Sequence, residues 1–212
     1  MIQLYGYWRS SASYRVRIAL HIKDIDFDYR AVHLVKDGGE QKSAAYAKLN
    51  PAQLVPTLVD GDLVLNQSLA IIEYLDSLAG PLLVPQDPKQ AAIVRMLAHD
   101  MASDLQPITN LRVLQYVTGT LDAGDAGRQA WIAHWVARAF AAFEVRLKQY
   151  SGRYCVGDNV TLADICLVPQ VYNAKRFDVD FTPYPTLMQV YENLQALEAF
   201  QKAAPERQAD AV

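Results

Sequence analysis

Residues 8–20 read WRSSASYRVRIAL, and the rest of the chain is organised around this stretch. The preceding residues 2–5 alternate apolar and polar side chains, which predicts a short strand. Apolar residues then recur at helical spacing, with Arg15 and Arg17 on other faces, so we predict a helix with serines at its N-terminus. Serine hydroxyls and free backbone N–H groups at such a point can hold an anion, for example a thiolate. The alternative is a capped helix with nothing bound.

The remainder of residues 1–80 shows a mixed order of strand and helix patterns. A weakly alternating run at 27–32 predicts a second strand, and 43–49 a short helix that Asn50-Pro51 ends. Asp60-Gly61 between two apolar runs predicts a β-hairpin. A third helix is expected over 67–78. The order β-α-β-α-β-β-α is that of a thioredoxin-like domain.

Pro56 stands at the head of the first hairpin strand, where it cannot donate to a sheet. We predict a cis Val55-Pro56 bond, which would offer the Val55 N–H and C=O groups to a ligand. The alternative is a trans proline that begins an edge strand. For the third helix, Ser68 or Asn66 is the expected N-cap. In a thioredoxin-like fold the serine loop, the Val55 turn and the start of this helix meet on one side.

Strand patterns disappear after residue 80. Three prolines predict a linker over 81–87, and an all-helical domain is expected over 88–212. Residues 88–118 predict a long helix bent near Pro107, and 119–127 interrupt the pattern. Apolar and aromatic residues between 131 and 147 then form a helical stripe, which we interpret as core. Thr161 and Asp164 have the spacing of a capping box and a structural role.

Composition excludes several classes of function. The net charge of −3 over 212 residues argues against a nucleic-acid partner. No run of 18 apolar residues and no apolar signal core occur, so we expect no membrane association and a cytoplasmic location. Cys155 and Cys166 have no metal-binding spacing and are expected as small buried residues, so no metal is predicted. The sequence motifs of nucleophilic hydrolases, dinucleotide enzymes and phosphate-binding loops are absent.

The run from Ser10 to Leu20 resembles the signature Ser-Ser-Cys-x-x-Arg-Val-Arg-Ile-Ala-Leu of the zeta-class glutathione transferases, the maleylacetoacetate isomerase family. Residues 49–51, 55–58 and 67–71 match more general glutathione-transferase landmarks. The departure is Ala12, where the family usually has cysteine, so the loop carries no thiol. Isomerisation by bound glutathione needs no protein thiol, so the core chemistry is expected to survive this departure. The resemblance implies the glutathione transferase fold and a homodimer.

The resemblance also implies roles for individual residues. Ser10 is expected to donate to the glutathione thiolate, assisted by Ser11, whereas Tyr5 and Tyr7 are not expected to replace them. Arg9 and Arg176 are expected to bind the carboxylates of the acid and to disperse negative charge that develops during reaction, with Arg112 as a third candidate. The expected glutathione-binding residues are Ser10, Ser11, Ala12, Gln41, Gln53, Val55, Pro56, Gln67, Ser68, Gln106 and Asn110.

The activity that the resemblance implies is glutathione-dependent isomerisation of maleylacetoacetate to fumarylacetoacetate, in the breakdown of aromatic amino acids or other aromatic compounds. Maleylpyruvate isomerase, the same chemistry on a shorter acid, is the first alternative, and Ala12 slightly favours it. A transferase acting on small halogenated acids is another. A glutathione-binding module without turnover belongs to a different class, and retention of the serines and arginines argues against it. A disulfide oxidoreductase is disfavoured because the loop has no cysteine.

Overall fold

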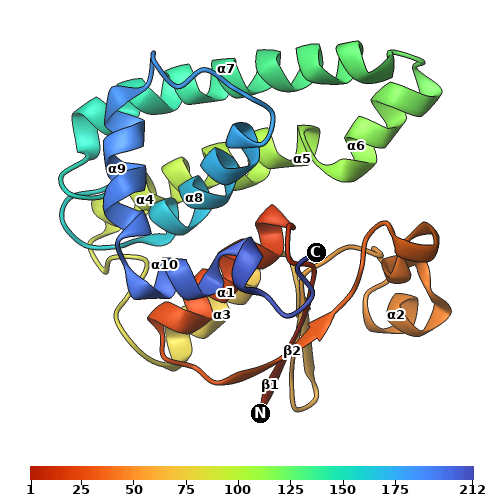
Figure 1. Cartoon of the computed structure of the whole chain (residues 1–212). Coiled ribbons are helices and arrows are strands. Elements are labelled where there is room, and N and C mark those ends of the chain that lie inside the picture. Colours follow the sequence, from red (N-terminus) through yellow and green to blue (C-terminus); the bar gives the residue numbers. More distant parts are fainter. The chain divides into compact units, whose positions relative to one another are not determined.

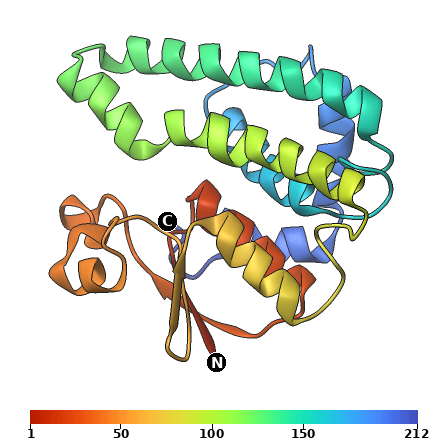
Figure 2. The same cartoon turned by 180° about the vertical axis from the view of Figure 1, so that it is seen from behind.

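The computed structural model describes residues 1–212 as two compact units (Figures 1 and 2). Unit 1 comprises Met1–Leu82 together with Leu197–Val212, and unit 2 comprises Leu83–Ala196. The sequence analysis expected residues 88–212 as one helical domain, whereas the chain from Leu197 onward belongs to unit 1. The reason is apolar burial: Phe200 and Ala203 lie on a short helix packed against the helix of residues 11–22 and are both fully buried.

Unit 1 contains a four-stranded sheet in the order β2-β1-β3-β4. Strand β1 pairs in parallel with β2 and antiparallel with β3, which pairs antiparallel with β4. The turn between β3 and β4 places Gly61 at φ 57, which glycine adopts without strain. The predicted order of elements along the chain and the predicted hairpin are therefore confirmed. The strands are β1 (Ile2–Gly6), β2 (Phe27–Ala31), β3 (Thr57–Asp60) and β4 (Leu63–Asn66).

Helices α1 and α3 lie side by side against the sheet, and α10 lies beside α1 (Figures 1 and 2). Apolar residues from these helices and from β1 and β3 form a core without solvent exposure, including Leu4, Val16, Leu20, Leu58 and Ile71. The helices of unit 1 are α1 (Ser11–Ile22), α2 (Ala44–Leu49), α3 (Ser68–Leu78) and α10 (Glu198–Ala203), with 3-10 turns at Lys36–Gly38, Glu40–Lys42 and Pro205–Arg207.

Three local predictions for unit 1 need correction. Arg15 and Arg17 were expected on faces of the first helix other than its apolar one, but only 2% and 0% of their surfaces are exposed. A buried guanidinium requires acceptors, and both have them: Arg15 donates to the Ser68 hydroxyl at 3.0 Å and Arg17 to the Ala203 carbonyl at 3.0 Å. The N-cap of α3 is Gln67, not Ser68 or Asn66, because Ser68 already lies inside the helix.

Unit 2 is helical, with one isolated β-bridge between Ser151 and Gly157. The long helix predicted for 88–118 is broken after Pro107, where Asn110 caps a new helix by accepting from the Val113 N–H at 3.1 Å. Its elements are α4 (Pro88–His99), a π-helical turn (Asp100–Leu105), α5 (Gln106–Ile108), α6 (Leu111–Gln115), a second π-helical turn (Tyr116–Thr120), α7 (Gly124–Tyr150), α8 (Leu162–Lys175) and α9 (Pro185–Gln195).

The core of unit 2 confirms the structural interpretation of its motifs. Phe140 and Phe143 on α7 are fully buried. The Asp164 carboxylate accepts from the Thr161 N–H at 2.8 Å and from the Cys155 N–H at 2.8 Å, so it organises the start of α8. Cys155 and Cys166 are free thiols without solvent exposure, as predicted, and burial raises the pKa of Cys155.

Candidate functional site

Three segments of unit 1 converge at one end of the sheet. Tyr5 of β1 is paired with Thr57 of β3, which is paired in turn with Asn66 of β4. The loop after β1, the turn before β3 and the start of α3 therefore lie at the same edge. We call the first of these segments loop 7–10, since residues 7–10 connect β1 to α1. The predicted convergence of the serines, Val55 and the start of α3 is what this register produces.

Ser10 is the N-cap of α1. Its hydroxyl oxygen accepts from the Ser13 N–H at 3.2 Å, and its carbonyl accepts from the Tyr14 N–H at 2.8 Å. A hydroxyl that accepts at its oxygen still has its hydrogen to donate. The N–H groups of Ser11 and Ala12 belong to the first helical turn, where no partner exists within the helix. Together with the helix dipole, these donors favour an anion above the N-terminus of α1.

Arg9 is half-buried and is held by its neighbours in loop 7–10. Its guanidinium donates to the Tyr7 hydroxyl at 3.4 Å and lies 4.5 Å from the centre of the Trp8 ring. The Tyr7 ring also meets the His33 ring edge to face at 5.0 Å. A cation stacked on an indole keeps its charge available for an anionic ligand. Loop 7–10 thus carries a hydroxyl donor and a guanidinium next to each other in sequence.

The Val55-Pro56 peptide bond is cis, which confirms the prediction. Side chains of the preceding segment hold the turn around it, because the Leu54 carbonyl accepts from the Tyr46 hydroxyl at 2.7 Å and from the Asn50 amide at 2.8 Å. Asn50 also donates to the Thr57 hydroxyl at 3.2 Å. The Val55 N–H and C=O groups have no hydrogen bond within the chain. They therefore remain available to pair with the main chain of a peptide-like ligand.

Four further predicted residues with polar side chains belong to the segments near this edge. Gln67 is exposed at φ 74, and Gln53 is half-buried at φ 54. Gln41 is 8% exposed and donates to the Leu34 carbonyl at 3.4 Å, while its Oε1 atom is buried without a hydrogen-bond partner. A buried acceptor without a partner costs free energy unless a ligand supplies a donor. Ser68 is 5% exposed and accepts from Arg15, as described above.

The predicted residues of unit 2 occupy helix ends. Gln106 begins α5, Asn110 caps α6 and Arg112 is exposed on α6. Arg176 is the exposed C-cap of α8, donates to the Asn173 side chain at 3.3 Å and lies 5.6 Å from the centre of the Phe177 ring. A cation at a helix C-terminus is favoured by the helix dipole. Arg112 and Arg176 are therefore accessible to solvent on the surface of unit 2.

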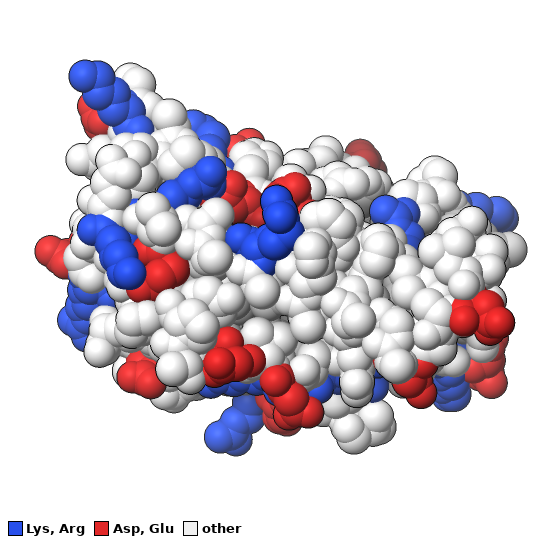
Figure 3. All heavy atoms as spheres, turned by 90° about the horizontal axis from the view of Figure 1, so that it is seen from above, with Lys and Arg blue, Asp and Glu red and all other residues white.

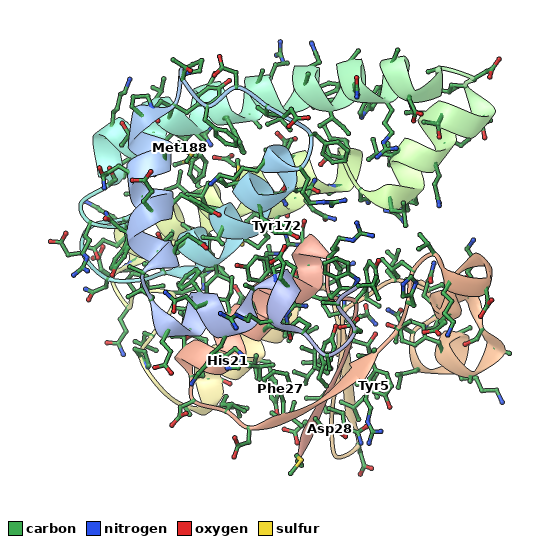
Figure 4. The ribbon with its side chains drawn as sticks, viewed as in Figure 1. Tyr5, His21, Phe27, Asp28, Tyr172 and Met188 are labelled. Carbon is green, nitrogen blue, oxygen red and sulfur yellow. The ribbon has the colours of Figure 1, made fainter.

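The tyrosine of β1 stays within the sheet. Tyr5 lies on β1 (Figure 4), where its hydroxyl donates to the Gln3 side chain at 3.3 Å and its ring lies 6.3 Å from that of Tyr46. Tyr7 is 5% exposed, and its hydroxyl accepts from Arg9. These contacts favour Ser10 over either tyrosine as the anion donor.

Sequence reasoning missed the residues that hold loop 7–10 in place. Asp210 accepts from the Trp8 N–H at 3.0 Å, and Arg17 donates to the Trp8 carbonyl at 2.9 Å. Asp210 is 202 positions away from Trp8 along the chain, so no local pattern relates them. Arg17 lies within the quoted stretch, but helical spacing does not reveal that it turns inward. Burial raises the pKa of Tyr29, whose hydroxyl donates to Asp210 at 3.4 Å.

The electrostatic character of the surface is mixed. On the face drawn in Figure 3, lysine and arginine side chains are interspersed with aspartate and glutamate among broad uncharged areas. No group of three or more His, Cys, Asp or Glu side chains is arranged to hold a metal ion. None of the helices combines the length and the apolar character that crossing a membrane requires.

Comparisons with known proteins relate both units to one family. Residues 4–83 match the glutathione S-transferase N-terminal domain, and residues 134–198 match its C-terminal domain. The chain is 54% identical to a probable maleylacetoacetate isomerase of Vibrio cholerae over 98% of this chain and 97% of that protein.

Two solved structures are similar over nearly the whole chain. A holo structure of a bacterial zeta-class maleylpyruvate isomerase shares 45% identity at a TM-score of 0.95, covering 99% of this chain and 100% of the other. The maleylacetoacetate isomerase of Anaeromyxobacter dehalogenans shares 39% identity at a TM-score of 0.88, covering 100% and 98%. That structure holds dicarboxyethyl glutathione and citrate in its active site.

Proposed function

The chain belongs to the glutathione S-transferase family, in its zeta class, and from this premise we propose that it converts maleylacetoacetate to fumarylacetoacetate. Glutathione is its cofactor, and the reaction is a cis–trans isomerisation of a maleyl-type diketo acid. The observation that carries the proposal is the serine-capped N-terminus of α1, with Arg9 beside it and the open Val55 main chain at the same edge of the sheet.

The residues of unit 1 fit a tripeptide thiol. The Val55 main chain can form a pair of hydrogen bonds with a peptide group, because its N–H and C=O groups have no hydrogen bond within the chain. The buried Oε1 atom of Gln41 needs a donor, which an amide or ammonium group would provide. Gln67 and Ser68 at the start of α3 offer donors to a carboxylate. Gln53, Gln106 and Asn110 remain proposed contacts of the cofactor.

Glutathione, when bound, would supply a nucleophilic thiolate for reversible addition to the cis double bond of the acid. The contribution of the chain begins with Ser10, which donates its hydroxyl hydrogen to the sulfur. A free thiol has a pKa of roughly 8.5, so donors that favour the anion raise the reactive fraction at neutral pH. The Ser11 hydroxyl and the first N–H groups of α1 act in the same direction.

Cationic side chains suit the acid substrate. Guanidinium groups bind carboxylates in a bidentate manner and can also disperse negative charge that develops on the substrate. Arg9 is proposed for this role in unit 1, where Tyr7 and Trp8 orient it. Arg176, with Arg112 as a third candidate, is proposed as a carboxylate-binding residue of unit 2. Their exposure leaves both of them accessible to a ligand.

The principal test is steady-state turnover of maleylacetoacetate and of maleylpyruvate by the purified chain, each with and without glutathione. We expect turnover that requires glutathione and a higher kcat/KM for maleylacetoacetate. A higher value for maleylpyruvate would replace the proposed substrate by the second candidate, which the likeness to the zeta-class maleylpyruvate isomerase supports. If the chain binds glutathione but turns over neither acid, the alternative of a glutathione-binding module without catalytic activity would replace the proposal.

A cytoplasmic homodimer completes the proposal. The expectation of a dimer comes from the family resemblance, and the expected location comes from the sequence, which has no run of 18 apolar residues. Light scattering coupled to size-exclusion chromatography tests the dimer, which should have about twice the 23.7 kDa mass of the chain. Fractionation of cells that express the chain tests the location.

A further inference from the structure

Loop 7–10 is held at both ends by short-range hydrogen bonds. The Tyr7 N–H donates to the Ser13 hydroxyl at 3.3 Å, and the Ser10 N–H donates to the Tyr7 carbonyl at 3.0 Å. Both bonds come from the strand–helix connection itself. Neither bond involves the N–H or the C=O group of Trp8, which lies at the middle of the loop.

Trp8 is instead held by two charged side chains from outside the loop. The Asp210 carboxylate accepts from the Trp8 N–H at 3.0 Å, and the Arg17 guanidinium donates to the Trp8 carbonyl at 2.9 Å. Hydrogen bonds to ionised groups are roughly twice as strong as neutral ones. The N–H group of Trp8 is therefore bound by a negatively charged side chain and its C=O group by a positively charged one.

The C-terminal segment brings Asp210 to this position. Both views show the C-terminus beside the end of β1 and the start of α1 (Figures 1 and 2). Arg17 links the same segment to the loop, because its Nε atom donates to the Ala203 carbonyl at 3.0 Å. Tyr29 on β2 donates to Asp210 at 3.4 Å. Helix α10 and the residues that follow it up to Asp210 thus contact the main chain of loop 7–10, directly and through Arg17.

The Trp8 ring forms no hydrogen bond of its own. It is 6% exposed, and its indole N–H is buried without a hydrogen-bond partner. Its orientation consequently depends on packing and on the main-chain bonds to Asp210 and Arg17. Arg9 stacks on this ring at 4.5 Å, so a shift of Trp8 would displace the guanidinium, and Ser10 is the second residue after it.

We propose that Asp210 is a positioning residue for the isomerase site, which acts by accepting from the Trp8 N–H and so aligning Arg9 and Ser10. The inference rests on the proposed function for its kinetic consequence, but not for its structural one. Removing the acceptor frees the Trp8 N–H and lets loop 7–10 move. A misplacement of about 1 Å at a reacting group can lower a rate on the order of 10²-fold.

The test compares the full-length variants Asp210→Ala, Asp210→Asn and Gln208→Ala with the native chain. Asparagine retains an oxygen that can accept from Trp8. Gln208 provides a matched control, since it anchors the same segment by donating to the carbonyls of Lys202 at 3.0 Å and Ala204 at 2.9 Å without touching loop 7–10. Kinetics, thermal unfolding and amide hydrogen exchange of the peptide containing Trp8 are measured for all four proteins.

For Asp210→Ala we expect kcat/KM for the acid to fall about ten- to hundredfold at a temperature where the protein stays folded. The Trp8 amide should lose protection from exchange. Asp210→Asn should recover to within about threefold of the native kcat/KM, and Gln208→Ala should match the native chain in both readouts. Native kinetics for Asp210→Ala would overturn the proposal. So would equal losses in Asp210→Ala and Gln208→Ala, or a failure of asparagine to rescue.

Hydrogen exchange separates this inference from the proposed function. If the native chain isomerises neither acid, the proposed function fails, while the exchange comparison still decides whether Asp210 holds the Trp8 main chain. If the native chain is active and the Trp8 amide is equally protected in Asp210→Ala, the positioning role fails alone.

Discussion

In unit 1 the candidate glutathione site is built from main chain that buried charges and caps hold in place, whereas in unit 2 the candidate acid-binding arginines are exposed at helix ends. Loop 7–10 is tied through Asp210 and Arg17, and the Val55 turn through Asn50 and Tyr46. Arg112 and Arg176 have no such enclosure. A fixed site is appropriate for a cofactor that the whole family shares. Exposed side chains that can change conformation are appropriate for acid substrates that differ between close relatives.

The largest effect should come from Ser10. Ser10→Ala removes a donor to the thiolate, and losing one such donor lowers kcat about 10²–10³-fold in comparable anion sites. It also removes the cap of α1, at about 1 kcal/mol of stability. Steady-state kinetics and glutathione binding separate the two effects, with kcat falling more than affinity.

Ser43→Ala is a suitable control for this variant. Ser43 caps α2 in the same manner, by accepting from the Tyr46 N–H at 3.2 Å. It should therefore lose stability and keep turnover. A loss of kcat in Ser10→Ala no greater than in Ser43→Ala would show that the loss of the helix cap alone explains the effect. The proposed donation from Ser10 to the thiolate would then be wrong.

A smaller effect of a different kind is expected for Arg176. Arg176→Ala should raise the KM for the acid about ten- to hundredfold, the range that a charged hydrogen bond supplies, with glutathione affinity unchanged. A loss of kcat accompanies it only if the guanidinium also stabilises negative charge that develops on the substrate. Arg176→Lys should rescue partly, because an ammonium keeps the charge but loses the fork. Kinetics with varied acid concentration measure both.

Arg128→Ala supplies the control for Arg176. The Arg128 guanidinium also lies against the Phe177 ring, at 5.3 Å from its centre, and pairs with Asp125 at 3.6 Å. It should leave the KM unchanged. If Arg176→Ala behaves like Arg128→Ala, the exposed arginine of α8 is an ordinary surface residue and the contrast between the units disappears.

Unit 2 also contains one firmly anchored group, which gives a prediction for stability. Glu144 on α7 is 4% exposed and accepts from the main-chain N–H groups of Thr186 at 3.1 Å and Leu187 at 2.8 Å, which lie in the first turn of α9. Glu144→Ala leaves these donors without a partner and should lower the free energy of unfolding by about 1–3 kcal/mol, as measured by urea denaturation. Glu192→Ala, an exposed change on α9, should be nearly neutral.

The pH dependence of this anchor follows from its charge. Burial raises the pKa of Glu144, but the hydrogen bonds from Thr186 and Leu187 and the charge of Lys148 outweigh it, and the net pKa is lowered. The stabilisation is therefore present above the ordinary glutamate value and is lost as the pH falls through the lowered one. Acid unfolding of Glu144→Ala that parallels the native chain down to the lowest pH would contradict this assignment.

The smallest predicted effect concerns His21 in unit 1, which lies beside Phe27 (Figure 4) with ring centres 5.6 Å apart. Burial lowers the pKa of His21, and the charges of Lys202 and Arg17 lower it further. The unfolded chain therefore takes up a proton near pH 6.5 before the folded chain does, and stability falls as the pH drops through that value.

His21→Gln should reduce this acid sensitivity by about 0.5 kcal/mol at most, measured as the difference in unfolding free energy between pH 7.5 and 5.5. His134→Gln, which changes an exposed histidine of unit 2, should leave the difference as it is in the native chain. Equal slopes for His21→Gln and the native chain would mean that the environment of His21 does not disfavour its charge.

Local patterns predicted most of the fold of unit 1. Alternation over the strands, the Asp60-Gly61 turn and the serines before α1 each depend on neighbours in sequence, and the structure confirms them. The cis bond before Pro56 was also predicted from its place at the head of a strand. Arg15 and Arg17 were misplaced because helical spacing assigns charged residues to solvent, while their acceptors come from α3 and α10.

The remaining differences depend on contacts between distant parts of the chain. The last helix joins unit 1 because Phe200 and Ala203 bury against α1, which its own sequence does not indicate. The break after Pro107 was expected as a bend, but the Asn110 cap turned it into a new helix. For the site, the loop that contains Ser10 could be recognised from the sequence. Asp210 could not, because its hydrogen-bond partner Trp8 is 202 positions away along the chain.

The place of cysteine in this chain has a practical consequence for experiments. Ala12 leaves the N-terminus of α1 without sulfur, and Cys155 and Cys166 have no solvent exposure. A thiol-specific reagent added to the folded protein should therefore report on glutathione alone. The native chain can serve as a background without reactive thiols for labelling, in which a single introduced cysteine carries the whole signal, and oxidation of its own cysteines should require unfolding.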